Sequence, residues 1–221
     1  MSTHVVRIWI PDRPGALGAV ASRIGSVRGD LIGIDILERG AGLAIDELVV
    51  TLPDADLVPL LLKEINEVDG VAVEDIVSVP GDGLPDPRLA ALETAAVLVQ
   101  LVDPGAVLDA LVGHAAHDFG AGWACVIDGG APRSLAAQGE PPPAPWVAAF
   151  VAGSRTAPEG APEDVAWAPL RRAGLDLVLG RPGRPIRARE RRQLAALGEI
   201  ADVRWAELAR VSALRAHPTA G

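Results

Sequence analysis

The stretch Pro11 to Gly15, which reads Pro-Asp-Arg-Pro-Gly, is the first whose residue types could bind a ligand. It lies between an alternating apolar run typical of a strand and a run with helical periodicity. The start of a helix leaves unpaired N–H groups and a partial positive charge, which favour a carboxylate or a phosphate. Gly15 would let such an anion approach the main chain, and Pro14 suits a first helical turn. The alternative is that Asp12 and Pro14 merely cap a helix.

Histidine, arginine and cysteine side chains offer other candidates. His114, His117 and Asp118 could supply metal ligands, but no further His or Cys cluster completes a site, so we expect a helix end and no metal. An arginine group could hold an anion or an acidic partner, although a solvated loop and helix start is the favoured interpretation. This group comprises Arg181, Arg184, Arg187, Arg189, Arg191 and Arg192. Cys125 lies in an apolar strand candidate, which favours buried packing.

Motifs of enzymes are not found in this sequence. Nothing resembles a nucleophile elbow, a phosphate-binding loop or a dinucleotide-binding fingerprint. We therefore expect no catalytic residues, no cofactor and no enzymatic activity.

Composition limits the class of protein. The 221 residues are 49% hydrophobic, enough for a sizeable core, and the length suits two small domains better than one large one. The single cysteine excludes an intrachain disulfide and favours the cytoplasm. The start lacks the pattern of a signal peptide, and no apolar run reaches the ~18 residues that span a bilayer, so no membrane association is expected. The net charge of −9 argues against nucleic acid as a partner.

Hydrophobic periodicity arranges the first 80 residues into six elements. Residues 5–10 alternate as a half-buried strand, and apolar residues after Gly15 recur at three- and four-residue steps as in a helix. Residues 31–38 alternate again with Ile32, Ile34 and Ile36 in phase. A third strand at 47–52, a helix opened by Asp54 and a fourth strand at 71–79 follow. The order is βαββαβ, a split pair of βαβ units.

The stretch DRPGALGAVASRIGSVRGDLIGIDI, together with this element order, resembles an ACT domain. These are small ligand-binding modules of amino-acid metabolism, and the likeness is greatest to the type associated with malic enzymes. It covers about residues 4–80 and implies a ferredoxin-like fold. It favours a ligand-binding role for the turn over simple capping.

The resemblance also implies a site between this turn and the start of the second strand of a neighbouring copy. The residues that match the turn are Asp12, Arg13, Pro14, Gly15, Ala16 and Leu17. Asp30 matches a position where the family commonly carries Asn. An ionised Asp accepts but cannot donate, so Asp30 would prefer a ligand amino group. Ligand identity is thus left open, as is loss of binding, in which case Asp30 would be a polar turn residue.

Residues 81–88, rich in proline and glycine, are predicted to be a linker between an ACT domain at 1–80 and a second domain at 89–221. Two helices broken at Asp103-Pro104 begin the second half. Strands at 123–128 and 133–139, a short helix, a hairpin and a long helix from about Ala188 follow. This order resembles a GAF domain, an α+β fold with a central antiparallel sheet flanked by helices. The whole chain is therefore expected to be α+β.

Three functional hypotheses follow. The first is a non-catalytic regulatory sensor, a homodimer that binds an amino acid or similar small metabolite at the ACT-like half and signals through the GAF-like half. The apolar stripe along the last helix also favours a homodimer. The second is an adaptor that works through dimerisation without a ligand. The third is an enzyme with an unrecognised site in the C-terminal half.

Overall fold

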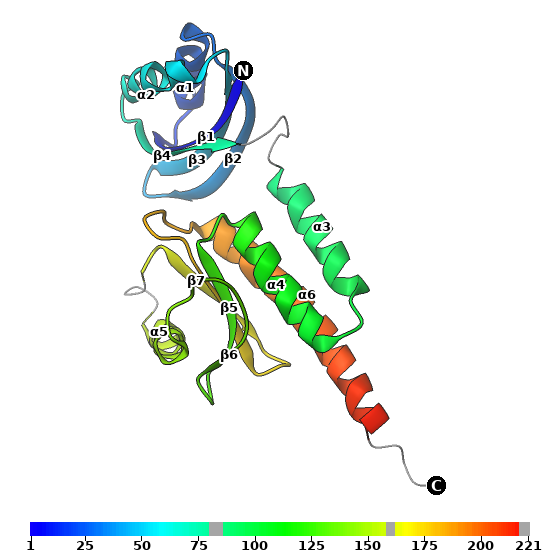
Figure 1. The fold of residues 1–221 in the computed structure, drawn as a ribbon. Coiled ribbons are helices and arrows are strands. Elements are labelled where there is room, and N and C mark those ends of the chain that lie inside the picture. The colour runs from blue at the N-terminus through cyan, green and yellow to red at the C-terminus, as the bar shows by residue number, and fades with distance from the viewer. Residues whose placement is uncertain (80–85, 158–161, 217–221) are drawn as a thin grey trace. The chain divides into compact units, whose positions relative to one another are not determined.

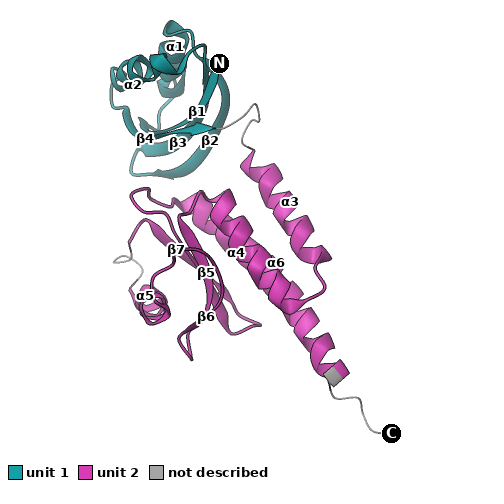
Figure 2. Ribbon diagram, in the orientation of Figure 1, with its two compact units in different colours: residues 1–85 teal, residues 86–221 magenta. Residues whose placement is uncertain are grey.

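The chain divides into two compact units, Met1–Pro85 and Asp86–Gly221 (Figure 1, Figure 2). The computed structural model describes residues 1–79, 86–157 and 162–216. Most of the expected linker, residues 81–85, lies outside the described residues, and the first helix of the second unit begins at Pro87.

The first unit is a four-stranded antiparallel sheet with two helices on one face (Figure 1). The strand order β2-β3-β1-β4 and the element order confirm the predicted βαββαβ arrangement. The elements are β1 (Ser2–Pro11), α1 (Ala16–Ser26), β2 (Asp30–Gly40), β3 (Leu43–Leu52), the 3-10 turn η1 (Ala55–Leu57), α2 (Val58–Asn66) and β4 (Ala72–Val79).

The core of the first unit lies between this sheet and its helices. The alternating apolar residues of β1, which are Val6, Ile8 and Ile10, are buried there, as the predicted half-buried strand requires. On α2, Leu61 and Ile65 are buried against the sheet, whereas Leu60 is 43% exposed.

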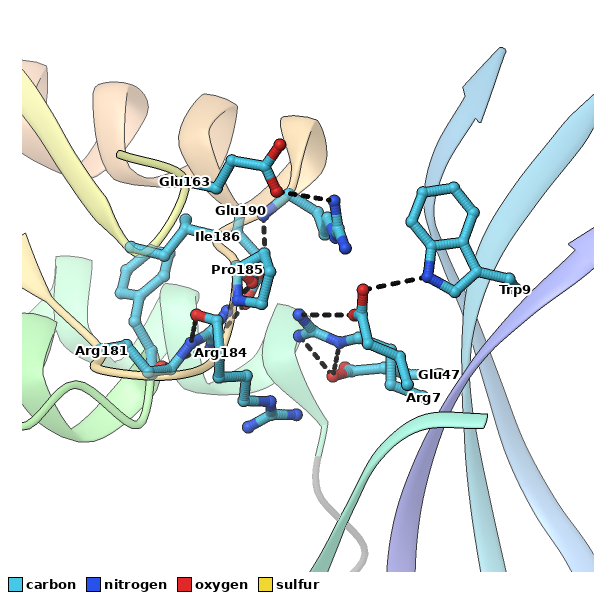
Figure 3. Close-up of polar contacts among 12 residues, drawn as sticks. Arg7, Trp9, Glu47, Glu163, Arg181, Arg184, Pro185, Ile186 and Glu190 are labelled. Atoms are coloured by element: carbon cyan, nitrogen blue, oxygen red, sulfur yellow. Dashed lines mark hydrogen bonds and ion pairs between the residues drawn. The ribbon is translucent and has the colours of Figure 1, made fainter. Parts of the chain in front are cut away.

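The other face of the first sheet carries a buried arginine. Arg7 Nη2 donates to Glu47 Oε1 at 2.7 Å, across the β1–β3 pair in which the two residues are partners (Figure 3). Trp9 Nε1 donates to Glu74 Oε1 of β4 at 3.1 Å. Glu74 Oε2 also lies 3.8 Å from Arg7 Nη1. Since a buried guanidinium without such partners would be costly, the two glutamates allow Arg7 to be buried.

The edge strand β2 departs from its predicted pattern. Ile34 and Ile36 were expected on a buried face, but they are 43% and 40% exposed. Both pair with inner-face positions of β3, Leu48 and Asp46, yet they remain uncovered at this edge. Register shifts before Gly33 and before Glu38 also interrupt the simple alternation.

The second unit is a three-layer arrangement around another four-stranded antiparallel sheet, with strand order β6-β5-β8-β7. Its elements are α3 (Pro87–Gln100), α4 (Pro104–Asp118), β5 (Trp123–Asp128), β6 (Arg133–Gly139), α5 (Ala144–Thr156), β7 (Val165–Leu170), β8 (Leu175–Gly180) and α6 (Ala188–Ala216). One core cluster joins α3, α4 and α6 to the sheet, and a second joins α5 to the opposite face (Figure 1). A central sheet flanked by helices was expected; the GAF-like assignment remains a prediction.

Local signals in the sequence place the helices of this unit. Asp103 caps α4 by accepting from the N–H of Ala106 at 2.8 Å, and Pro104 follows at the first helical position, as predicted.

The apolar stripe of α6 gives less support to dimerisation than expected, because Leu194, Leu197 and Ala201 are buried in the unit's own core.

Candidate functional site

The turn before α1 contains a left-handed backbone conformation, at Gly15. Gly15 is the residue before the helix and has φ of +88°, a value that side chains rarely adopt. The helix begins at Ala16, so the expectation that Pro14 occupies the first helical turn is wrong. No side chain caps this helix, which also corrects the alternative in which Asp12 serves as the cap.

Backbone donors are open at this helix start. Gly15 is exposed, and its carbonyl accepts from the N–H of Ala19 at 3.0 Å. Within the described part of the chain, no acceptor is found for the N–H groups of Leu17 and Gly18. A Cβ atom added at Gly18 would meet nothing within 4 Å. Two open amides at a helix N-terminus can hold a carboxylate.

The predicted turn residues differ in their surroundings. The N–H of Asp12 donates to the carbonyl of Gly42, in the β2–β3 connection, at 2.9 Å. Arg13 lies 3.7 Å from Asp69, and both side chains are largely exposed, so this pair contributes little to stability. Ala16 is buried and Leu17 is partly buried against the core, which anchors the helix start.

Asp30 does not join this turn within one chain. Asp30 pairs with Thr51, whose partner on β1 is Thr3, whereas Pro11 pairs with Leu43 and thus with the far end of β2. Eight residues of strand, roughly 25 Å, separate Thr3 from Pro11. The two parts of the predicted site therefore lie at opposite ends of one sheet.

Asp46 is a residue of interest that sequence reasoning missed. It is 5% exposed on the inner face of β3, and its Oδ1 accepts no hydrogen bond from any described residue. Burial raises the pKa of Asp46 and the nearby Asp12 charge raises it further, while Arg39 lowers it. The only signal in the sequence is an Asp amid apolar residues, in a stretch interpreted as leading into the strand.

Of the candidate metal ligands in the second unit, His114 and Asp118 contact the neighbouring helix α3, and His117 is exposed. Thr94 Oγ1 donates to Asp118 Oδ2 at 2.8 Å and lies 3.1 Å from His114 Nδ1. Among the residues that the structure describes, no group of three or more His, Cys, Asp or Glu residues could hold a metal ion.

Arginines of the group that could bind an anion form hydrogen bonds within the chain itself. Arg181 is 5% exposed and donates to both carboxylate oxygens of Glu190, at 2.8 and 3.0 Å, and to the carbonyl of Pro185 at 2.6 Å (Figure 3). Arg191 donates to the carbonyls of Ile186 and Val165. The interpretation of this segment as a solvated loop is therefore wrong for these two side chains, which bind internal partners.

Comparisons with known proteins reveal limited likeness. No family model and no curated protein matches this chain. The ACT domain of the GTP pyrophosphokinase of Chlorobium tepidum aligns over 36% of this chain and 100% of its own length, with 16% identity and a TM-score of 0.29. An uncharacterised protein of Thermotoga maritima aligns over 35% of this chain and 95% of its own, with 23% identity and a TM-score of 0.28. Likenesses of this strength assign no function to the chain.

The helices of the chain differ from membrane-spanning helices. Within the ranges 1–79, 86–157 and 162–216, none combines the length and the apolar content that a span requires.

Proposed function

We propose that the first unit is a regulatory module that binds an amino acid or a similar small acid at the start of α1. The observation that carries this proposal is the exposed glycine turn, with φ of +88° at Gly15 and open N–H groups at Leu17 and Gly18. These groups suit a carboxylate. The resemblance of the turn and of the βαββαβ order to ACT domains points to the same role.

The acidic residues around the turn favour an amino group on the same ligand. Asp12 flanks the turn, and its charge acts on the buried carboxyl of Asp46. An amino group placed between the turn and these carboxylates would reduce their mutual repulsion. An α-amino acid carries both groups on one carbon atom.

A second copy would complete this site with Asp30. The strand β2 lies at the edge of its sheet and carries two exposed isoleucines, Ile34 and Ile36. If β2 pairs antiparallel with β2 of a partner about a two-fold axis, each Asp30 comes to the end of the joint sheet where the partner's turn lies. The proposed protein is thus a homodimer with two composite sites.

The proposed role is non-catalytic. The groups gathered at the turn are backbone amides and carboxylates, which suit binding, and the described residues there provide no nucleophile paired with a base. We propose that ligand binding is signalled through the second unit.

The test is a thermal-shift screen of the standard amino acids and common 2-oxo acids, with calorimetry on each hit. Binding to the native state alone adds about 2.7 kcal/mol at a hundredfold excess over Kd. Gly18→Leu should abolish the response because its side chain would cover the open amides. Gly25→Leu, in the last turn of the same helix and equally open around its Cβ, is the matched control. A screen without hits, or a response that survives Gly18→Leu, would refute the proposal.

A further inference from the structure

A cavity of about 600 Å³ lies on the α5 face of the second unit's sheet. It is bounded by the β5–β6 turn, α5, β7, the β7–β8 turn and the start of β8, and it includes apolar walls from Val151 and Trp167. This volume is in the range of small-molecule sites, which are mostly apolar with a few placed polar groups.

Asp176 is the buried polar group of this cavity. It is 4% exposed and lies on β8 between its partners Ile127 and Pro169. Its Oδ1 accepts from Arg155 Nη2 at 2.6 Å, whereas its Oδ2 accepts from no residue in the described part of the chain. Because Oδ2 is not fully enclosed, it can accept from a donor that enters the cavity.

The burial of Asp176 affects the pKa of its carboxyl group. Burial raises the pKa of Asp176, and the charge and hydrogen bond of Arg155 offset part of that rise. The single ion pair therefore does not fully offset the effect of burial on the pKa of Asp176.

Arg155 supplies the opposite charge at the mouth of the cavity. Its side chain is 51% exposed, and its guanidinium lies 4.9 Å from the ring centroid of Trp167. Only one of its nitrogen atoms donates to a described residue, so its remaining N–H groups face the ligand space or solvent. This cation–π contact holds the guanidinium over the ring without using those donors.

Access to the free oxygen of Asp176 is kept open by a glycine. A Cβ atom at Gly129 would lie 3.7 Å from Asp176 Oδ2. Gly129 is not among the positive-φ glycines, so a side chain could be tolerated by its backbone. Its absence leaves room for a ligand group beside the carboxylate.

We propose that this cavity binds a small zwitterion, an α-amino acid with an apolar side chain, and that it is a second ligand site independent of the turn at α1. The ammonium group would donate to Asp176 Oδ2, the carboxylate would accept from Arg155, and the side chain would contact Val151 and Trp167. The two protein groups are adjacent and their charges cancel. A ligand with only one charge would therefore bring an unbalanced charge into the cavity, whereas a zwitterion adds no net charge and offers a partner to each protein group.

The experiment is calorimetry on the full chain with L-leucine and L-phenylalanine up to about 10 mM, a range that detects weak binding. N-acetyl-L-leucine and L-leucinamide, which lack one charge each, should bind about tenfold more weakly or worse. Arg155→Gln and Gly129→Val should weaken L-leucine binding by a similar factor. Gly153→Val, on α5 but outside the cavity lining, is the steric control. Asp176→Asn tests the buried oxygen directly.

The outcomes separate this site from the turn at α1. Binding that is lost in Gly129→Val and kept in Gly18→Leu supports the cavity, whether or not the turn binds anything. Binding that responds only to Gly18→Leu overturns the cavity proposal and leaves the first site standing. The proposal also fails if neither amino acid binds, or if the blocked derivatives bind as well as L-leucine. If Asp176→Asn does not fold, the half-exposed Arg155→Gln still decides the question.

Discussion

Gly15 and Asp30 lie at opposite ends of one antiparallel sheet, because β1 leads to the turn while β2 begins beside Thr51 at the other end. A ligand that contacts both residues must therefore bridge two copies of the chain. This relationship makes the oligomeric state part of the functional hypothesis.

The exposed isoleucines of β2 are expected to support the dimer. Ile34→Lys should shift the protein toward monomer, because a charge would be buried at the paired edge. Leu60→Lys is the matched control, since Leu60 is also 43% exposed but lies on α2. Light scattering at micromolar concentration measures the state. A wild-type monomer, or equal effects of the two substitutions, would contradict edge pairing.

The backbone at Gly15 should make it intolerant of any side chain. Gly15→Ala is expected to cost about 1–2 kcal/mol because φ is +88°. Gly25→Ala, in a normal helical conformation, should stabilise by about 0.5–1 kcal/mol. A Cβ atom added at either glycine would meet nothing within 4 Å, so the comparison isolates backbone conformation. Urea denaturation of both variants provides the values, and equal shifts would exclude the strain argument.

Asp46 should make stability depend on pH. Its pKa is raised above 3.8 in the folded protein, so the folded state holds the proton more tightly than the unfolded state. The contribution of Asp46 to the free energy of unfolding is fully present below about pH 3.8, and it is lost as the pH rises through the raised pKa. Asp46→Asn cannot ionise, so its free energy of unfolding relative to wild type should increase from acid to neutral pH. Urea titrations measure both free energies of unfolding, and a difference between variant and wild type that stays constant with pH would disprove this prediction.

Cys125 should be chemically inert in the native protein. It is fully buried, and burial raises its pKa to about 11, so little thiolate forms at pH 8. Alkylation by iodoacetamide should be slow until denaturant is added and then complete. Rapid modification of the folded chain would show that the α5 face of the sheet opens.

Sequence patterns are most informative where local chemistry decides the structure. The Asp103-Pro104 break and the start of α6 at Ala188 follow from capping and periodicity, and both are found where expected. The exposure of Ile34 is not predictable in this way, because alternation reports which face a side chain takes and not whether a helix covers that part of the sheet.

The candidate sites depend even more on distant contacts. The αL conformation of Gly15 fits a proline-glycine turn, which a sequence can indicate. Asp46 and Asp176 instead become notable through burial among residues from other strands and helices. Asp176 pairs with Arg155, which lies 21 positions earlier in the chain. This pair forms only because α5, which carries Arg155, packs on the face of the sheet that carries the Asp176 side chain.

Complementation between two defective chains tests the composite site most directly. Gly18→Leu should block the turn, Asp30→Lys should remove the acceptor supplied by the other copy, and neither variant alone should bind the ligand found for wild type. A mixed dimer of the two variants, purified through two different tags, contains one doubly defective site and one intact site. We predict that calorimetry of this mixed dimer finds one ligand bound per dimer. If wild type binds but the mixed dimer does not, the site lies within a single chain and the account of a shared site is contradicted.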